Sequence, residues 1–459
     1  MIKITNKNRK IAVAIIISVT FTVLMGLFLF RPNNAEILVP GNIAMTVDGL
    51  NVSVGFYNYF YSASTSPEIL LELEKQYEDF DQNIPLDEQI YDAKTGETWS
   101  EYTRKTVEEQ ITSLIKAYNE GIKAGVFVFD EQQKNIDTII KALESEAKEL
   151  SIGTSDYTGY TYGDYVGVKT VRKILEMSYI AQNYYEYFVV NNTLSQEDYK
   201  KFFENNKTKL ISVEYFCCEF TADEKSLDEA ENAVELLIPE LSSSNFEKIL
   251  KKNFSEFSLS FFKSRNNLLY FEGSEKMKNW LFDDCRKAGD KIVIADEEEK
   301  RLYVVLVLKE PKDELKVTCS AREIAMRVSD FGDWDSLEKT ANEIEAKIKE
   351  ADNKEFAFAV YADIYMNNIK SDKYSGGLVT NLENGDGEAE KWLFDSDRKR
   401  EDFVRLKTEN GYYLIMYVER KPSWQFYADE EIKSSEFKKI MKNSKLQKRY
   451  AFRFTEGYS

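Results

Sequence analysis

The spacing of hydrophobic positions predicts a helical first half of the chain. Apolar residues recur every three or four positions over 106–124, 130–147 and 169–190, which is the pattern of helices with one buried face. Gly125 follows the first of these segments, where a helix end is expected. Residues 157–167, rich in Tyr, Gly and Thr, are expected to form a loop. Ahead of the helices, residues 45–52 have the pattern of strand, turn and strand.

The longest apolar run lies near the N-terminus. Residues 11–30 contain no charge, and twenty helical residues span about 30 Å, the thickness of a bilayer core. The charges before the run are all basic, which predicts a cytoplasmic tail at 1–10 and export of the body. We therefore expect a single-pass cell-membrane anchor at 11–30 and a tether at 31–43. A cleaved signal peptide is the alternative, and the choice between them stays open.

The second half of the chain contains an internal repeat. Residues 279–283 read Asn-Trp-Leu-Phe-Asp and residues 391–395 read Lys-Trp-Leu-Phe-Asp. The apolar run 302–307 is aligned with 413–418, and each run is followed by a proline, Pro311 or Pro422. Several landmarks at a nearly constant offset predict two copies of one domain, at 207–311 and 315–422. In each copy a strand, two helices, a loop, the Trp-Leu-Phe segment and a closing hairpin follow one another, which predicts an α+β fold with a small antiparallel sheet.

Composition excludes several kinds of chemistry. The chain has no histidine, so a Ser-His-Asp triad, a Cys-His dyad and a His-ligated zinc are impossible. The net charge is −18, and the first 31 residues carry +5, so the body carries −23 and disfavours nucleic acid. The cysteines have no metal-site spacing and are interpreted as apolar strand residues, with disulfides left open: Cys217, Cys218, Cys285 and Cys319. We expect no metal and no cofactor.

Three segments of the second copy resemble motifs of the parvulin family of peptidyl-prolyl isomerases. Residues 317–325, Val-Thr-Cys-Ser-Ala-Arg-Glu-Ile-Ala, resemble the opening strand V-x-A-x-H-I-L, and residues 371–378 resemble the loop S-x-G-G-x-L-G. Residues 411–415, Gly-Tyr-Tyr-Leu-Ile, resemble the closing G-Y-H-I-I. The whole chain resembles exported foldases of the PrsA and SurA type, in which residues 44–206 would be the helical chaperone domain. In that arrangement a C-terminal helix at 429–455 would pack back on this domain.

The resemblance also implies where a site would lie. The two family histidines fall on Glu323 and Tyr413, which are the candidate catalytic residues. The implied substrate-binding residues are Phe356, Trp392, Phe394, Gly376 and Gly377. The first copy lacks both the histidines and the Gly-Gly loop. A glutamate and a tyrosine can still donate and accept hydrogen bonds, but the imidazole pair is absent, so we expect weak isomerase activity or none.

The function expected from these features is a membrane-anchored chaperone for unfolded, newly exported polypeptides. A working isomerase and a structural partner in a cell-surface complex are the alternatives, and a homodimer stays open. Two aromatic clusters, at 57–61 and 184–188, fit either helix cores or a client-binding surface.

Overall fold

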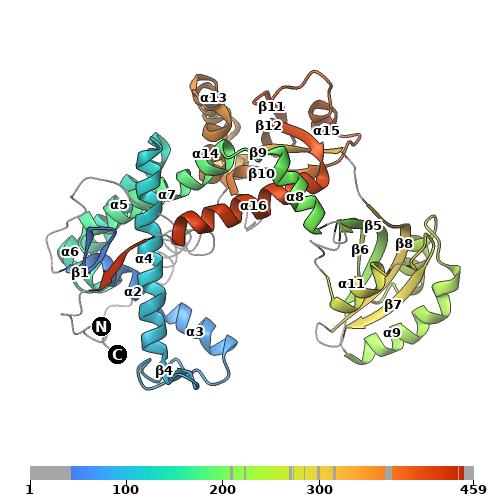
Figure 1. Ribbon diagram of the computed structural model, residues 1–459, viewed down its shortest axis with the longest axis horizontal. Coiled ribbons are helices and arrows are strands. Elements are labelled where there is room, and N and C mark those ends of the chain that lie inside the picture. The colour runs from blue at the N-terminus through green and yellow to red at the C-terminus, as the bar shows by residue number, and fades with distance from the viewer. Residues whose placement is uncertain are drawn as a thin grey trace.

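The computed structural model describes residues 43–206, 210–221, 224–267, 271, 273–283, 285–296, 300–313, 317–366, 375–442 and 444–448. Within these ranges, no helix is both long enough and apolar enough to cross a bilayer. The membrane span expected at residues 11–30 lies outside the described residues. The described chain combines helices with small antiparallel sheets, as the α+β prediction requires (Figure 1).

The first region is a short hairpin followed by helices. Its elements are β1 (Ile43–Val47), β2 (Leu50–Ser53), α2 (Val54–Ser64), α3 (Pro67–Gln76), β3 (Ile90–Asp92), β4 (Glu97–Thr98), α4 (Trp99–Lys123), α5 (Asp130–Glu149), α6 (Thr154–Tyr162), α7 (Val168–Asn191) and α8 (Gln196–Asn206). Thr98 and Glu101 form a reciprocal capping box that starts α4. Gly121 lets α4 approach α7, because a Cβ there would lie 2.8 Å from Cγ2 of Ile180.

The loop expected at 157–167 was only partly correct, since the loop is confined to 163–167 and α6 extends to Tyr162. Its sequence has no continuous apolar face, so the spacing of hydrophobic residues gives no helical signal. A buried polar contact holds the helix instead: the Thr158 hydroxyl donates to the carbonyl of Val166 at 2.6 Å.

The two copies of the repeat form sheets with the same strand order. The first repeat, residues 211–313, contains β5 (Ile211–Thr221), α9 (Glu224–Leu237), η2 (Ile238–Glu240), α10 (Phe246–Asn253), β6 (Ser258–Asn267), α11 (Glu275–Leu281), β7 (Lys291–Asp296) and β8 (Arg301–Asp313). The second repeat, residues 317–422, contains β9 (Val317–Arg327), α12 (Val328–Phe331), α13 (Trp334–Glu350), α14 (Lys354–Met366), η4 (Ser375–Gly377), β10 (Leu378–Leu382), α15 (Glu388–Leu393), β11 (Phe403–Lys407) and β12 (Gly411–Pro422). The orders are β6-β5-β8-β7 and β10-β9-β12-β11.

The register corrects the sequence alignment of the closing strands. Val307 pairs with Tyr215 just before a bulge in β8, and Tyr417 pairs with Ala321 just before a bulge in β12. Tyr303 therefore occupies the position of Tyr413, one residue away from the alignment that began at Leu302. A shift of one residue reverses which face of a sheet a side chain occupies, so this correction matters for the site.

The repeated Trp-Leu-Phe-Asp segments make the same contact in both copies, in which an arginine side chain packs on the tryptophan ring. The Arg286 guanidinium lies 4.7 Å from the Trp280 ring centroid, and Arg398 lies 4.7 Å from that of Trp392. Each arginine also reaches an aspartate four residues later, Asp290 at 3.6 Å in the first repeat. The conserved spacing thus reflects an arginine held between an indole ring and a carboxylate.

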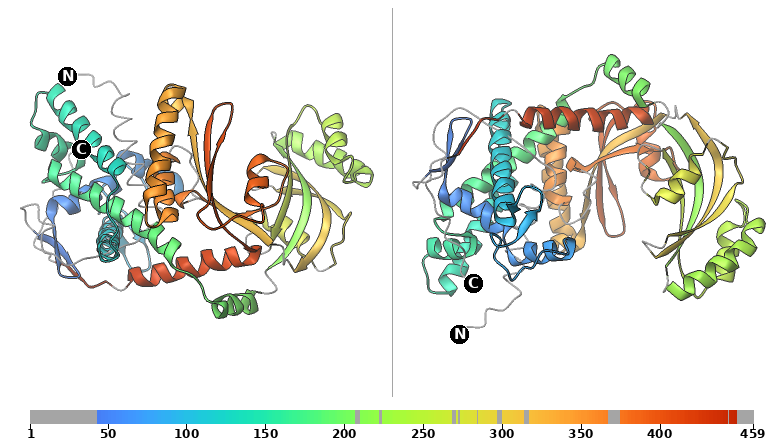
Figure 2. Two further views of the ribbon diagram at one scale, coloured as in Figure 1. Left: turned by 90° about the horizontal axis from the view of Figure 1, so that it is seen from above. Right: turned by 60° about the horizontal axis from the view of Figure 1, so that its bottom comes forward.

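The two repeats differ in how they join the rest of the molecule. Among the described residues, the buried clusters of the first repeat contain only that repeat's own side chains, and Figures 1 and 2 place it at one end of the molecule. The second repeat packs α12, α13, α14 and one sheet face into the same core as α4, α5 and α7. The second repeat and the helical region therefore share one hydrophobic core.

The C-terminal segment returns to the first region. Helix α16 (Ser423–Lys442) carries Phe437, whose ring lies 4.9 Å from that of Tyr185 on α7. Strand β13 (Leu446–Lys448) then pairs with β1, Met45 opposite Lys448. The prediction of one helix over 429–455 was wrong at this end, because the chain leaves the helix after Lys442 to complete a three-stranded sheet; residues 449–455 lie outside the described residues.

The cysteines are free thiols. Cys217, Cys218 and Cys319 are buried on strands β5 and β9, as expected for apolar strand residues, and burial raises the pKa of the Cys319 thiol to about 11. Cys285 contradicts that interpretation, since it is exposed in the turn after α11.

Candidate functional site

The pairing of β9 with β12 places Glu323 and Tyr413 on the same face of the second repeat's sheet. Glu323 lies opposite Ile415, and Tyr413 lies opposite Ala325. Residues opposite each other in an antiparallel pair share a face, and so do residues two apart on one strand. The two candidate residues are therefore diagonal neighbours, with Cα atoms roughly 7–8 Å apart.

Apolar side chains surround this pair. Cys319, Ala321, Ile415 and Tyr417 are buried on the same face, under Leu393 of α15. Around them lies a half-buried rim, formed by Leu382, Ala389, Trp392, Phe394, Val404 and Leu406. The side chains of the intervening β9 residues, among them Arg322 and Ile324, lie on the opposite face of the sheet.

Glu323 is a half-buried acid on this face. Burial, reinforced by the nearby Glu390 carboxylate, raises its pKa above the ordinary value. No hydrogen bond or ion pair of its side chain, to Tyr413 or to any other side chain, is found among the described residues. The site therefore offers an acidic group and a phenol on an apolar background, without a hydrogen-bonded relay joining them.

The same face is closed in the first repeat. Cys217 takes the position of Glu323 and Tyr303 that of Tyr413, according to the register of β5 and β8. Tyr303 is 5% exposed, whereas Tyr413 is 39% exposed. Side chains from α11 and from Phe271 cover the first repeat's face, so at this strand position the tyrosine is accessible in the second repeat and buried in the first.

The aromatic residues implied as substrate-binding separate into two places. Trp392 and Phe394 lie beside the Glu323 face, although Arg398 covers one side of the Trp392 ring and Arg420 lies 5.7 Å from the Phe394 ring centroid. Phe356 lies on α14 in the core shared with the helical region, 5.6 Å from Tyr187 and 5.9 Å from Phe129. The structure therefore does not bring Phe356 together with Glu323 and Tyr413.

The two implied glycines lie against the backbone of β9. Both have positive φ, 59° at Gly376 and 66° at Gly377. A Cβ on Gly377 would lie 2.3 Å from the carbonyl oxygen of Glu323. The Gly-Gly sequence thus allows this turn to pack directly on the strand that carries the candidate residue.

A buried cluster of charges lies behind this face, and the sequence analysis missed it. Arg322 is fully buried and donates to Oε2 of Glu186 at 3.2 Å, to Oε1 of Glu355 at 3.2 Å and to the Gly376 carbonyl at 2.7 Å. Arg400 donates to the other oxygen of Glu355 at 2.8 Å. The cluster connects α7 of the helical region with β9, α14 and η4 of the second repeat.

Asp363 on α14 joins this cluster. Its Oδ1 accepts from the amide of Gly376 at 2.7 Å. Burial, with the Glu186 carboxylate adding to it, raises the pKa of Asp363 to about 8. The sequence shows this cluster only as single charged residues within apolar runs, namely Glu186 between tyrosines and Arg322 on a predicted strand. Neither residue's neighbours in sequence indicate which residue it would pair with.

Both aromatic clusters singled out in the sequence belong to the core. Tyr57, Tyr59, Phe60 and Tyr184 are each less than 9% exposed, and the 184–188 segment packs on Phe437 and Phe356. Their interpretation as helix core faces was correct. The alternative of a client-binding surface is not supported, since the rings pack on the core: four are buried, and four are half-buried, namely Tyr61, Tyr185, Tyr187 and Phe188.

No protein-family model and no curated protein matches the chain. Among solved structures, it is similar to the foldase protein PrsA from Streptococcus pneumoniae, with 12% identity over 75% of this chain and 97% of that one and a TM-score of 0.20. PrsA from Lactococcus lactis gives 11% identity, 72% and 96% coverage and a TM-score of 0.22. A structure from a study of the SurA-like chaperones PEB4 and Cj1289 of Campylobacter jejuni is also similar. It shares 13% identity over 61% of this chain and 83% of that one, with a TM-score of 0.16. At these values the similarities carry no conclusion about this chain's activity.

Proposed function

We propose that this protein is a chaperone for unfolded exported polypeptides, held at the outer face of a cell membrane by residues 11–30. In this proposal its two parvulin-like repeats bind chains and isomerise prolyl bonds weakly or not at all. The observation that carries the proposal is the apolar, partly open sheet face of the second repeat, where Tyr413 is exposed and Glu323 has no hydrogen bond to it.

This face suits binding better than catalysis. Rotation about a prolyl bond faces a barrier of about 18–20 kcal/mol, and lowering it requires groups that bind the twisted amide best. A half-buried carboxyl with a raised pKa and a diagonal tyrosine form no connected polar cluster. An extended apolar segment, in contrast, needs only an accessible apolar face, which this sheet offers.

A second apolar surface supports client binding. The segment from α3 to β4 folds around Trp99, whose ring contacts Tyr77, Phe80 and Tyr91. Apolar side chains of this segment are more than 40% exposed, namely Leu71, Tyr77, Ile84 and Ile90. Figure 1 places the segment at one end of α4, below the level of α16. Exposed apolar groups concentrated on one small substructure are typical of interaction surfaces.

An aggregation assay tests the chaperone activity. The client is reduced, unfolded α-lactalbumin, an acidic protein, because a basic client would bind the acidic body through charge alone. We expect the full chain to suppress light scattering at equimolar amounts or a few-fold excess, and the L71S/I84S/I90S variant, which alters only the second apolar surface, to lose part of the suppression while keeping its circular dichroism spectrum. No suppression at several-fold excess would refute the proposal and leave a structural partner of a surface complex as the better explanation.

A prolyl-peptide assay separates binding from catalysis. The observation that favours an isomerase is that Glu323 and Tyr413 share one face of the sheet. We expect little acceleration of cis–trans exchange measured by NMR on Xaa-Pro peptides. A large acceleration that disappears in both Tyr413→Phe and Glu323→Ala would instead assign catalysis to the second repeat.

A further inference from the structure

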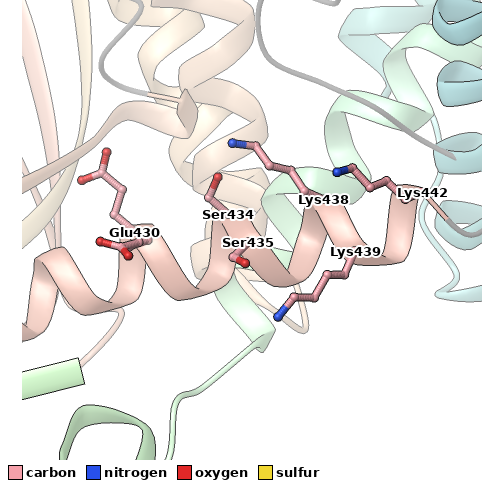
Figure 3. Close-up of a pocket in the computed structure, with 7 residues that line it drawn as sticks. Glu430, Ser434, Ser435, Lys438, Lys439 and Lys442 are labelled. Atoms are coloured by element: carbon pink, nitrogen blue, oxygen red, sulfur yellow. The ribbon is translucent and has the colours of Figure 1, made fainter. Parts of the chain in front are cut away.

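Three lysines gather at the C-terminal end of α16. Lys438, Lys439 and Lys442 line an open hollow along this helix, together with Ser434 and Ser435, and the hollow ends at Glu430 and Glu431 (Figure 3). All three lysines are exposed. Among the described residues, none of the three forms an ion pair or a hydrogen bond through its ammonium group. Excess positive charge is therefore available here, on a chain whose body is otherwise strongly acidic.

The helix holds these lysines in a fixed place. The opposite side of α16 buries Phe437 and Met441, and Phe437 packs on the rings of Tyr184, Tyr185 and Phe188. Lys433, one turn earlier, donates to the Val189 carbonyl of α7 at 2.9 Å. The basic end is thus presented by a packed helix rather than by a loose tail.

The basic end also lies close to the start of the described chain. After Lys442 the chain continues to Lys445, whose amide donates to Asp48 in the β1–β2 turn at 2.6 Å. The three residues from Lys442 to Lys445 span at most about 10 Å, and the strand from Asp48 back to Ile43 spans about 17 Å more. Residues 31–42, between the expected membrane span and Ile43, reach at most about 40 Å. Residues 31–42 are therefore long enough to let the lysines reach the bilayer surface.

We propose that Lys438, Lys439 and Lys442 bind the phosphate headgroups of anionic lipids in the membrane that holds residues 11–30. The inference rests on the proposed anchor. Ammonium groups attract a negatively charged lipid surface, and the attraction decays within a Debye length, so proximity to the tether is needed. The two acids that line the same hollow, Glu430 and Glu431, lie at the end away from the lysines. The Asp48 carboxylate accepts a hydrogen bond from the Lys445 amide. The contact would orient the body on the bilayer and direct the second repeat's open face to one side.

The test uses the full chain in nanodiscs of phosphatidylcholine alone or with 30% phosphatidylglycerol. Hydrogen exchange of the α16 peptide around 438–442 is measured by mass spectrometry. We expect exchange about threefold slower or more in the anionic discs, with the difference lost in 0.5 M NaCl and in the K438Q/K439Q/K442Q variant. A matched control, K248Q/K251Q/K252Q, removes three exposed lysines from α10 of the first repeat and should keep the difference.

The outcomes separate the two proposals. Equal exchange in both discs, with the protein remaining in the disc fraction, would overturn lipid binding and leave the anchor in place. A chain that does not enter discs at all would overturn the anchor. Protection in neutral discs on adding soluble polyphosphate, without protection by phosphatidylglycerol, would overturn the lipid assignment in favour of an anionic polymer.

Discussion

Arg322 of the second repeat lies 3.2 Å from Glu186 of the helical region, and both side chains are only 1% exposed. The arginine also contacts Glu355 and the Gly376 carbonyl, so one guanidinium connects four segments of the chain. Burying this many charges is favourable only when each finds a partner. The pair therefore fixes how the second repeat sits on α7, and with it the direction in which the Glu323 face opens.

Replacing Arg322 should destabilise the protein strongly. Arg322→Met keeps the volume but leaves Glu186 and Glu355 without their shared partner, which is expected to cost about 3–5 kcal/mol of unfolding free energy. Urea unfolding followed by circular dichroism measures the loss. Arg327→Met, at the exposed end of the same strand, is the control and should stay within about 0.5 kcal/mol. Equal stability of the two variants would contradict the role given to the cluster.

Asp363 should make stability depend on pH. Its folded pKa of about 8 lies above the unfolded value of about 3.9, so the folded state keeps a proton that the unfolded state releases. This group therefore lowers stability as pH rises from about 4 to about 8, by at most about 1.4 kcal/mol per pH unit, and contributes no further change above that range. Melting temperatures from pH 5 to 9 should show a decline that is weaker in Asp363→Asn, whose neutral amide mimics the protonated acid. Asp330→Asn, an exposed change, should keep the wild-type profile.

Glu323→Gln should stabilise the protein at neutral and alkaline pH. Burial and the neighbouring Glu390 raise the pKa of Glu323, so its ionisation opposes folding and the wild type loses stability as pH rises through that pKa. The gain should nearly vanish at pH 4, just below the ordinary glutamate pKa of about 4.3, where the acid is mostly protonated in both states. Thermal melts of the two proteins at pH 4 and pH 8 make the comparison, and a variant less stable than wild type at pH 8 would reveal a partner for this carboxylate.

The periodicity of apolar residues was sufficient to predict the long helices and the closing strands, but it could not predict polar contacts between distant parts of the chain. Helices α4, α5 and α7 and the closing hairpins of the repeats follow from apolar spacing and repeated landmarks, because each signal lies within a short stretch of chain. Strands β6 and β10 lie before the Trp-Leu-Phe segments, where a loop was expected, so that prediction was wrong. The Arg322–Glu186 contact joins residues 136 positions apart, and nothing local specifies it. The register of Tyr303 was misassigned by one residue, because two apolar runs can be aligned with a shift of one residue and only the strand pairing distinguishes the alternatives. The motif resemblance picked out Glu323 and Tyr413, but their shared face follows from the pairing of β9 with β12, and the lack of a bond between them could not be predicted.

Gly377→Ala should cost more stability than a positive φ alone explains. Gly377 has φ of 66°, and an added Cβ would lie 2.3 Å from the Glu323 carbonyl and 2.8 Å from Cβ of Ala362. Gly125 has φ of 77° but open space around its missing Cβ, so Gly125→Ala measures the backbone cost by itself, about 1–2 kcal/mol. The Gly377 variant should lose about 1–3 kcal/mol more, the cost of displacing the turn from β9. Urea unfolding of both variants gives the difference, and a Gly377 penalty no larger than that of Gly125 would show that the turn can move away from the strand at no cost.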